Sequence, residues 1–180
     1  MRAREISKLC RVPLLGVDED HQFAVIQCPL HHICGEEIET LRRRFSEEDL
    51  DMTEEVLPPH VTIFYGLKDF HLSDLQEALK DFGELEFTMM PKPKVFDNPR
   101  HDVLFLPIES TDFKRLHTHI GRLTGVAPPT YKTYIPHCTV AFLKKGVSYS
   151  HASLSKPVHG RALSLEFLTT TEKPYLIELV

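Results

Sequence analysis

The chain has 180 residues, of which 42% are hydrophobic, and carries a formal net charge of −5. This length and apolar content suit one compact domain with an ample core, so we expect residues 1–180 to form a single domain. A negative net charge argues against a protein that coats duplex nucleic acid through phosphate contacts. The charge is uneven, because residues 1–90 sum to −10 and residues 91–180 to +5. An anionic ligand held mainly by the second half would not be repelled.

The apolar runs and the cysteines indicate the cellular location of the protein and whether a membrane is a partner. The longest apolar runs are strand-sized, and residues 1–7 lack the apolar core of a secretory signal. The cysteines lack the spacing of a disulfide framework, at positions Cys10, Cys28, Cys34 and Cys138. We therefore expect reduced thiols, a monomer, no membrane partner and a cytoplasmic location, in the host cytoplasm if the source is viral.

Hydrophobic periodicity predicts strands and helices in the first half of the chain. In chain order these are a strand, a helix, a second strand and a second helix, at residues 21–30, 35–45, 59–64 and 73–83. An acidic connection at residues 46–58 precedes the second strand, and Pro58 and Pro59 stop any helix before it.

The second half continues in the same manner. Strands are predicted at residues 84–90, 94–97 and 102–108, a helix at 111–123, and further strands at 136–141, 161–170 and 174–180. Strands and helices mixed without strict alternation favour an α+β architecture. We expect two similar lobes related by an approximate two-fold axis, with a central groove between them.

One four-residue pattern occurs twice, as Pro59-His60-Val61-Thr62 and as Pro136-His137-Cys138-Thr139. On a strand, period-2 alternation puts the His and Thr of each copy on one face, about 6.6 Å apart. A strand-like and a helix-like segment precede each copy, so the pattern of one strand–helix–strand unit occurs twice within the chain. Two such strands side by side would present two imidazoles and two hydroxyls to one cavity.

This set of side chains matches the needs of phosphodiester cleavage. A neutral imidazole can take a proton from the attacking oxygen, and a protonated one can deliver a proton to the departing oxygen. Threonine hydroxyls can donate hydrogen bonds to the non-bridging phosphate oxygens. The pattern therefore predicts a metal-free acid–base phosphodiesterase without a cofactor, and either histidine could be the base.

The two motifs, with the continuation Thr62-Ile63-Phe64-Tyr65-Gly66, resemble the 2H phosphoesterases, which include LigT-like 2′-5′ RNA ligases and cyclic phosphodiesterases. The resemblance covers residues 22–180. It implies a bilobal fold with antiparallel sheets, outer helices and no metal. It also implies catalytic roles for His60, Thr62, His137 and Thr139. The compact form is similar to phage enzymes that destroy cyclic oligonucleotide signals of bacterial antiviral defence.

Three functional hypotheses follow. The first is hydrolysis or opening of a small nucleotide phosphodiester, either a cyclic or a 2′,5′-linked oligonucleotide. The second is processing of 2′,3′-cyclic phosphates at RNA ends, and the third is a nucleotide-binding module without turnover. Candidate substrate contacts, which could equally be core or exposed loop residues, are Phe64, Tyr131, Lys132 and Tyr134.

Other histidines and cysteines have simpler interpretations. Cys28, His31, His32 and Cys34 are four potential zinc ligands, but no second ligand pair appears, so a strand end followed by a helix start is favoured. His117 and His119 lie two apart in a predicted helix and are expected at the surface.

Overall fold

The computed structural model describes residues 23–68, 72–80, 82–124, 133–169 and 174–179. Three helices occur in these ranges: α2 His31–Arg42, α3 Leu72–Leu79 and α4 Thr111–Thr124. The strands are β1 Phe23–Pro29, β2 His60–Lys68, β3 Leu85–Met89, β4 Lys94–Asp97, β5 Asp102–Glu109, β6 His137–Leu143, β7 Val158–Ala162, β8 Ser164–Thr169 and β9 Tyr175–Glu178. The predicted α+β class is confirmed. Within the described ranges, no helix has the length and apolar character needed to cross a bilayer.

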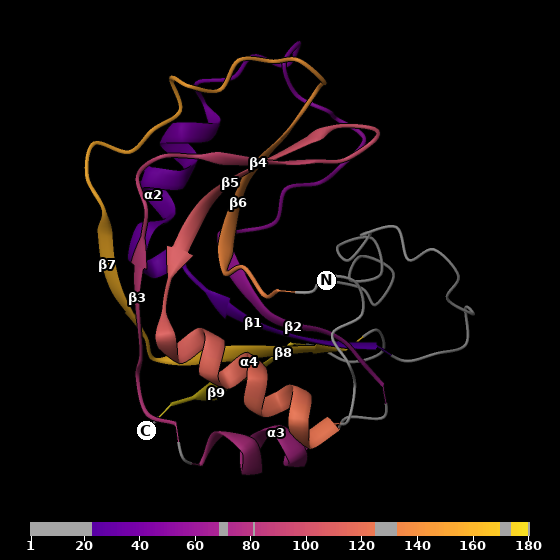
Figure 1. Cartoon of the computed structure of the whole chain (residues 1–180), viewed down its shortest axis with the longest axis vertical. Coiled ribbons are helices and arrows are strands. Elements are labelled where there is room, and N and C mark those ends of the chain that lie inside the picture. Colours follow the sequence, from indigo (N-terminus) through magenta and orange to yellow (C-terminus); the bar gives the residue numbers. More distant parts are fainter. Residues whose placement is uncertain (1–22, 69–71, 81, 125–132, 170–173, 180) are drawn as a thin grey trace.

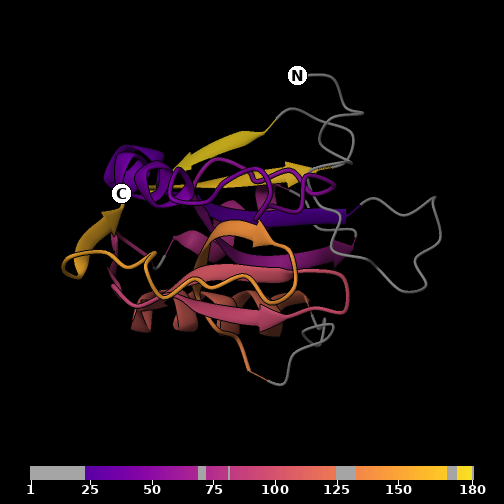
Figure 2. The same cartoon turned by 90° about the horizontal axis from the view of Figure 1, so that it is seen from above.

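The strands form one antiparallel sheet in the order β7-β3-β5-β6-β2-β1-β8-β9, and β4 pairs with β5 outside this path. The sheet is strongly curled, since β1, β2 and β8 run across the view of Figure 1 while β3 and β7 run steeply. Figure 2 shows α2 and α4 on opposite sides of the stacked strands. The two halves of the sheet meet where β2 pairs with β6, at Val61↔Cys138. The two halves are therefore parts of one continuous sheet and do not form two separate sheets.

Most predicted elements are present, with shifted ends. Helix α2 begins at His31, four residues before the predicted start, and contains one non-helical residue, Cys34 (φ −145°). The predicted strand at 161–170 is two strands, β7 and β8. Residues 158–160 are not predicted as strand, because the sequence Val-His-Gly-Arg-Ala lacks a strand-like pattern. Gly160 is needed there because a Cβ atom would lie 2.5 Å from the Phe87 ring.

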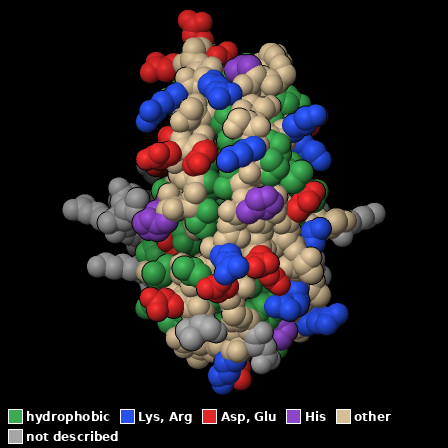
Figure 3. Space-filling view, turned by 90° about the vertical axis from the view of Figure 1, so that its left-hand side faces the viewer, with side chains coloured by type: hydrophobic (Ala, Val, Ile, Leu, Met, Phe, Trp, Pro, Cys, Tyr) green, Lys and Arg blue, Asp and Glu red, His purple; other side chains and the backbone are tan. Residues whose placement is uncertain are grey.

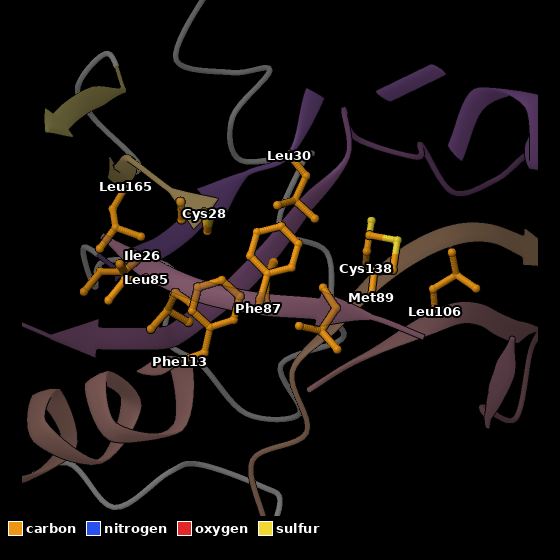
Figure 4. Packing of buried hydrophobic residues seen from close by; sticks show 14 of the residues in the cluster. Ile26, Cys28, Leu30, Leu85, Phe87, Met89, Leu106, Phe113, Cys138 and Leu165 are labelled. Atoms are coloured by element: carbon orange, nitrogen blue, oxygen red, sulfur yellow. The ribbon is translucent and has the colours of Figure 1, made fainter. Parts of the chain in front are cut away.

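Strands from both ends of the sheet share one hydrophobic core because the sheet curls. In Figure 4, Phe87 of β3 and Phe113 of α4 lie near Ile26 of β1. The Phe87 and Phe113 rings are stacked, with centroids 5.6 Å apart. Val61 and Cys138 also lie in this core and are 0% exposed. Alternation along β2 and β6 therefore turns the neighbouring His and Thr side chains to the opposite face.

Candidate active site

The two motif strands have matching neighbours. We call β1–α2–β2 the first unit and β5–α4–β6 the second unit. In each unit the motif histidine lies opposite a proline, and the pairs are Pro29↔His60 and Pro107↔His137. The residue after that proline donates a backbone hydrogen bond to the proline before the histidine, in the bonds Leu30 N–Pro59 O (2.8 Å) and Ile108 N–Pro136 O (2.9 Å). The same local structure thus supports both motifs.

The matching extends to a β-bulge directly after each threonine. In the first unit Gln27 pairs with Thr62 and Ile26 pairs with Phe64, which leaves Ile63 as the extra residue. In the second unit Phe105 pairs with Thr139 and Leu104 with Ala141, which leaves Val140 as the extra residue. Each bulge ends the regular alternation of faces just beyond the motif.

The bulge at Ile63 corrects the prediction for Phe64. Uninterrupted alternation would put Phe64 on the face of His60 and Thr62. Because one extra residue is inserted, Phe64 turns to the core instead, where it is 2% exposed and pairs with Ile26. Phe64 is therefore a core residue, which agrees with the second of the two interpretations left open by the sequence, a substrate contact or a core residue.

The β2–β6 pairing brings the four motif side chains together. Because the strands are antiparallel and Val61 faces Cys138, His60 lies beside Thr139 and Thr62 beside His137. All four residues are half-buried. The two histidines are diagonal neighbours, and such positions are about 7–8 Å apart.

Both imidazoles are held in the same tautomer. His60 Nδ1 contacts the Pro58 carbonyl oxygen at 2.8 Å, and His137 Nδ1 contacts the Ile135 carbonyl oxygen at 2.7 Å. A carbonyl oxygen only accepts hydrogen bonds, so each neutral ring carries its proton on Nδ1. Nε2 then remains as the atom that can accept or deliver a proton.

Burial lowers the pKa of both histidines below the usual value of 6.5. At His60 the bond to Pro58 and the charge of Glu166 oppose this effect, and the Arg42 charge lowers the pKa further. At His137 the bond to Ile135 opposes it, and the charge of His60 lowers the pKa further. A bound anionic phosphate would raise both pKa values, because an opposite charge favours the imidazolium form.

The two ends of the site differ in chemistry. On the β8 side, Gln27 Nε2 donates a hydrogen bond to Glu166 Oε2 at 2.7 Å. On the other side, the rings of Phe96 and Phe105 contact His137, with centroid distances of 4.9 and 5.2 Å, and stack on each other at 4.0 Å. A nearly symmetric centre therefore has one polar, acidic flank and one aromatic flank.

The sequence leaves two interpretations of Tyr134 open, a substrate contact or an exposed loop residue. In the structure the Tyr134 hydroxyl donates a hydrogen bond to the Thr62 carbonyl oxygen at 2.9 Å, and burial raises the pKa of Tyr134. Its ring stacks on His117, with centroids 4.0 Å apart. The other two predicted contacts, Tyr131 and Lys132, lie outside the described residues.

Sequence reasoning missed two residues that touch the motif strands. His117, expected at the surface, is half-buried, and its Nδ1 contacts the Ile63 carbonyl oxygen at 2.7 Å. Its helical spacing from Phe113 and Ile120 was an available signal. Arg42 donates from Nε to the Val140 carbonyl oxygen at 2.7 Å. No local pattern could have shown a contact between residues 98 positions apart.

The four potential zinc ligands do not converge. Cys28 and Cys34 are buried, and burial raises the pKa of each thiol to about 12. His31 and His32 are exposed. Among the described residues, no group of three or more His, Cys, Asp or Glu side chains is arranged to hold a metal ion.

The surface shown in Figure 3 carries intermixed acidic and basic side chains, with histidines among them. This face has no continuous basic stripe of the kind that follows a nucleic-acid backbone.

Comparisons with known proteins agree with this geometry. The model of the 2′-5′ RNA ligase superfamily matches residues 29–170. No curated protein matches the chain. Among solved structures, LigT from Escherichia coli complexed with 3′-AMP has a TM-score of 0.53 at 12% identity, and the alignment covers 89% of this chain and 96% of that one.

Two further structures share the fold. Usb1 from Kluyveromyces marxianus with uridine monophosphate has a TM-score of 0.53 at 9% identity, covering 87% of this chain and 98% of that chain. TT0787 from Thermus thermophilus has a TM-score of 0.51 at 18% identity, covering 89% of this chain and 95% of that chain. The fold and the family match together confirm the resemblance drawn from the two motifs. The chain belongs to the 2′-5′ RNA ligase superfamily, the 2H phosphoesterases.

Proposed function

We propose that the chain is a metal-independent phosphodiesterase that hydrolyses or opens a small nucleotide phosphodiester, either a cyclic oligonucleotide or a 2′,5′-linked one. The observation that carries this proposal is the pairing of β2 with β6, which sets His60 and His137 on one face with Nδ1 engaged in each ring. The 3′-AMP of LigT and the uridine monophosphate of Usb1 are mononucleotides, which supports a small nucleotide as the ligand.

The proposed reaction uses both imidazoles at once. Nε2 of the neutral histidine accepts a proton from the attacking oxygen of water or of a ribose hydroxyl, and that oxygen forms a bond to phosphorus. As the bond to the departing oxygen breaks, Nε2 of the protonated histidine delivers a proton to it. Thr62 and Thr139 donate hydrogen bonds to the non-bridging oxygens, where negative charge must be held. The histidines end with exchanged protonation states, which solvent restores.

The flanks of the site favour a small substrate. A nucleobase can pack against the half-buried ring of Phe96, next to His137. On the other flank, the Glu166 carboxylate would repel any further phosphate brought next to it, because like charges repel.

One observation favours a second candidate, the processing of 2′,3′-cyclic phosphates at RNA ends. The LigT ligand is a nucleoside with a 3′-phosphate. Opening a 2′,3′-cyclic phosphate needs the same pair of proton transfers and leaves a phosphate at that end of the ribose.

The test is a substrate panel assayed with EDTA present. It contains cyclic dinucleotides, 2′,5′-oligoadenylate and RNA ending in a 2′,3′-cyclic phosphate. Turnover of the first or second supports the main proposal, and turnover of the third alone supports the second candidate. Thermal stabilisation by a ligand that is recovered unchanged would indicate a binding module. Activity that EDTA abolishes and Zn²⁺ restores would contradict a metal-independent reaction.

A further inference from the structure

The bulges after Thr62 and Thr139 leave backbone groups outside the regular ladder, because an extra residue disrupts the pairing. In each unit, carbonyl oxygens at the bulge accept hydrogen bonds from side chains. Those side chains come from the other unit. The first unit supplies the donor for the second motif, and the second unit supplies donors for the first motif.

Arg42, at the end of α2, is the donor for the second motif. Its Nε donates to the Val140 carbonyl oxygen at 2.7 Å, and its Nη2 lies 3.5 Å from the Thr139 carbonyl oxygen. The same Nη2 donates to the Leu57 carbonyl oxygen at 2.9 Å, just before the first motif. Nη1 pairs with Glu39. The Arg42 side chain is 16% exposed and thus connects the chain segments of both motifs from inside the molecule.

Tyr134 and His117 are the donors for the first motif. Tyr134 donates its hydroxyl to the Thr62 carbonyl oxygen at 2.9 Å, and His117 Nδ1 lies 2.7 Å from the Ile63 carbonyl oxygen. The two rings are nearly parallel, with an interplanar angle of 6°. Stacking fixes both donors relative to each other, so they hold two consecutive carbonyl groups of β2.

We propose that Arg42 and the Tyr134–His117 pair are positioning residues, which hold the two His-x-Thr strands in register from opposite units. This inference rests on the proposed function, because it assigns these side chains a role in the same reaction. Val61↔Cys138 is the register that joins β2 to β6. Contacts on the carbonyl groups beside it resist sliding or spreading of the strands. A misplacement of about 1 Å of the reacting groups can cost about 10²-fold in rate.

Conservative variants test the proposal. Arg42→Lys keeps the charge, but one ammonium group cannot reach the carbonyl oxygens that the guanidinium spans. Tyr134→Phe removes one oxygen atom and keeps the stacking. For each variant we expect kcat to fall about 10²-fold with KM little changed. His117→Asn keeps an N–H donor and should retain more activity than His117→Ala.

Two matched variants serve as controls. Arg44 also donates to backbone carbonyl oxygens, those of His151 and Ser153, which lie away from the motifs. His119 lies on the same helix as His117 and contacts Phe82. Arg44→Lys and His119→Asn should leave kcat unchanged. Urea unfolding of every variant shows whether the assayed protein is folded.

Wild-type kcat in both Arg42→Lys and Tyr134→Phe would overturn the proposal. If the wild type cleaves no member of the panel, the proposed function fails, and ¹⁵N NMR of the imidazoles tests the positioning role alone. Tyr134→Phe and Arg42→Lys should then each shift imidazole resonances of the two motif histidines, because both residues bind carbonyl groups beside them. Unchanged resonances in both variants would contradict positioning without reference to activity.

Discussion

His60 and His137 each place Nδ1 against the carbonyl oxygen of the residue two positions earlier, at 2.8 and 2.7 Å. A proline stands between donor and acceptor in both cases, and it favours an extended backbone for the residue before it. The repeated Pro-His sequence therefore produces the same tautomer twice. The two rings differ only in what surrounds them, Glu166 near His60 and Phe96 against His137.

Replacing either histidine should abolish turnover and leave the fold intact. For His60→Ala and His137→Ala we expect kcat/KM to fall by about 10²–10⁴-fold each, because each variant loses one proton-transfer group. Both side chains are half-buried on the face away from the core, so circular dichroism should be unchanged. The double variant should lose little more than either single variant, since the residues act as a unit. Most of the activity remaining in one single variant would contradict the mechanism.

The shared face of His60 and Thr62 could be predicted from the sequence because the two residues are only two positions apart on one strand. Alternation holds over that distance, and the second copy repeats it. The prediction failed at Phe64, two residues further, because a bulge reverses the face and depends on the partner strand. Arg42 could not be predicted at all, since its hydrogen bonds depend on tertiary packing.

The pH dependence of kcat/KM should peak below pH 6.5. The reaction needs one neutral and one protonated imidazole, and burial lowers both pKa values from 6.5 in the free protein. At a pH below both pKa values neither histidine is neutral, so no base is present. At a pH above both values neither histidine is protonated, so no acid is present. The optimum of kcat should lie at higher pH, because a bound phosphate raises both pKa values. A kcat/KM optimum above pH 7 would contradict this assignment.

The Glu166 carboxylate provides a second test of the pH profile. The charged groups near His60 are Glu166, Arg42 and His137. Glu166 raises the His60 pKa, so Glu166→Gln should move one limb of the profile to lower pH. Glu178→Gln, an exposed change on β9, should leave the profile in place.

Removing one threonine hydroxyl should slow the reaction without weakening substrate binding. Thr62→Val and Thr139→Val keep the shape and the β-branch but lose the donor to the non-bridging oxygen. Loss of one such donor costs about 10²–10³-fold in kcat. Thr→Ser at the same positions keeps the hydroxyl and should retain most of the rate. Equal rates for the Val and Ser variants would show that these hydroxyls do not stabilise the transition state.

The core position of Phe64 can be separated from a role in the site by comparing two ring deletions. Phe64→Ala should lower the free energy of unfolding by about 3–5 kcal/mol, measured in urea, because it empties a buried position in a packed core. Phe96 is half-buried beside His137. Phe96→Ala should cost less stability and raise KM for a nucleotide substrate. The reverse result, with KM affected by Phe64→Ala and stability by Phe96→Ala, would mean that β2 lacks the bulge at Ile63, and the register of the site would need revision.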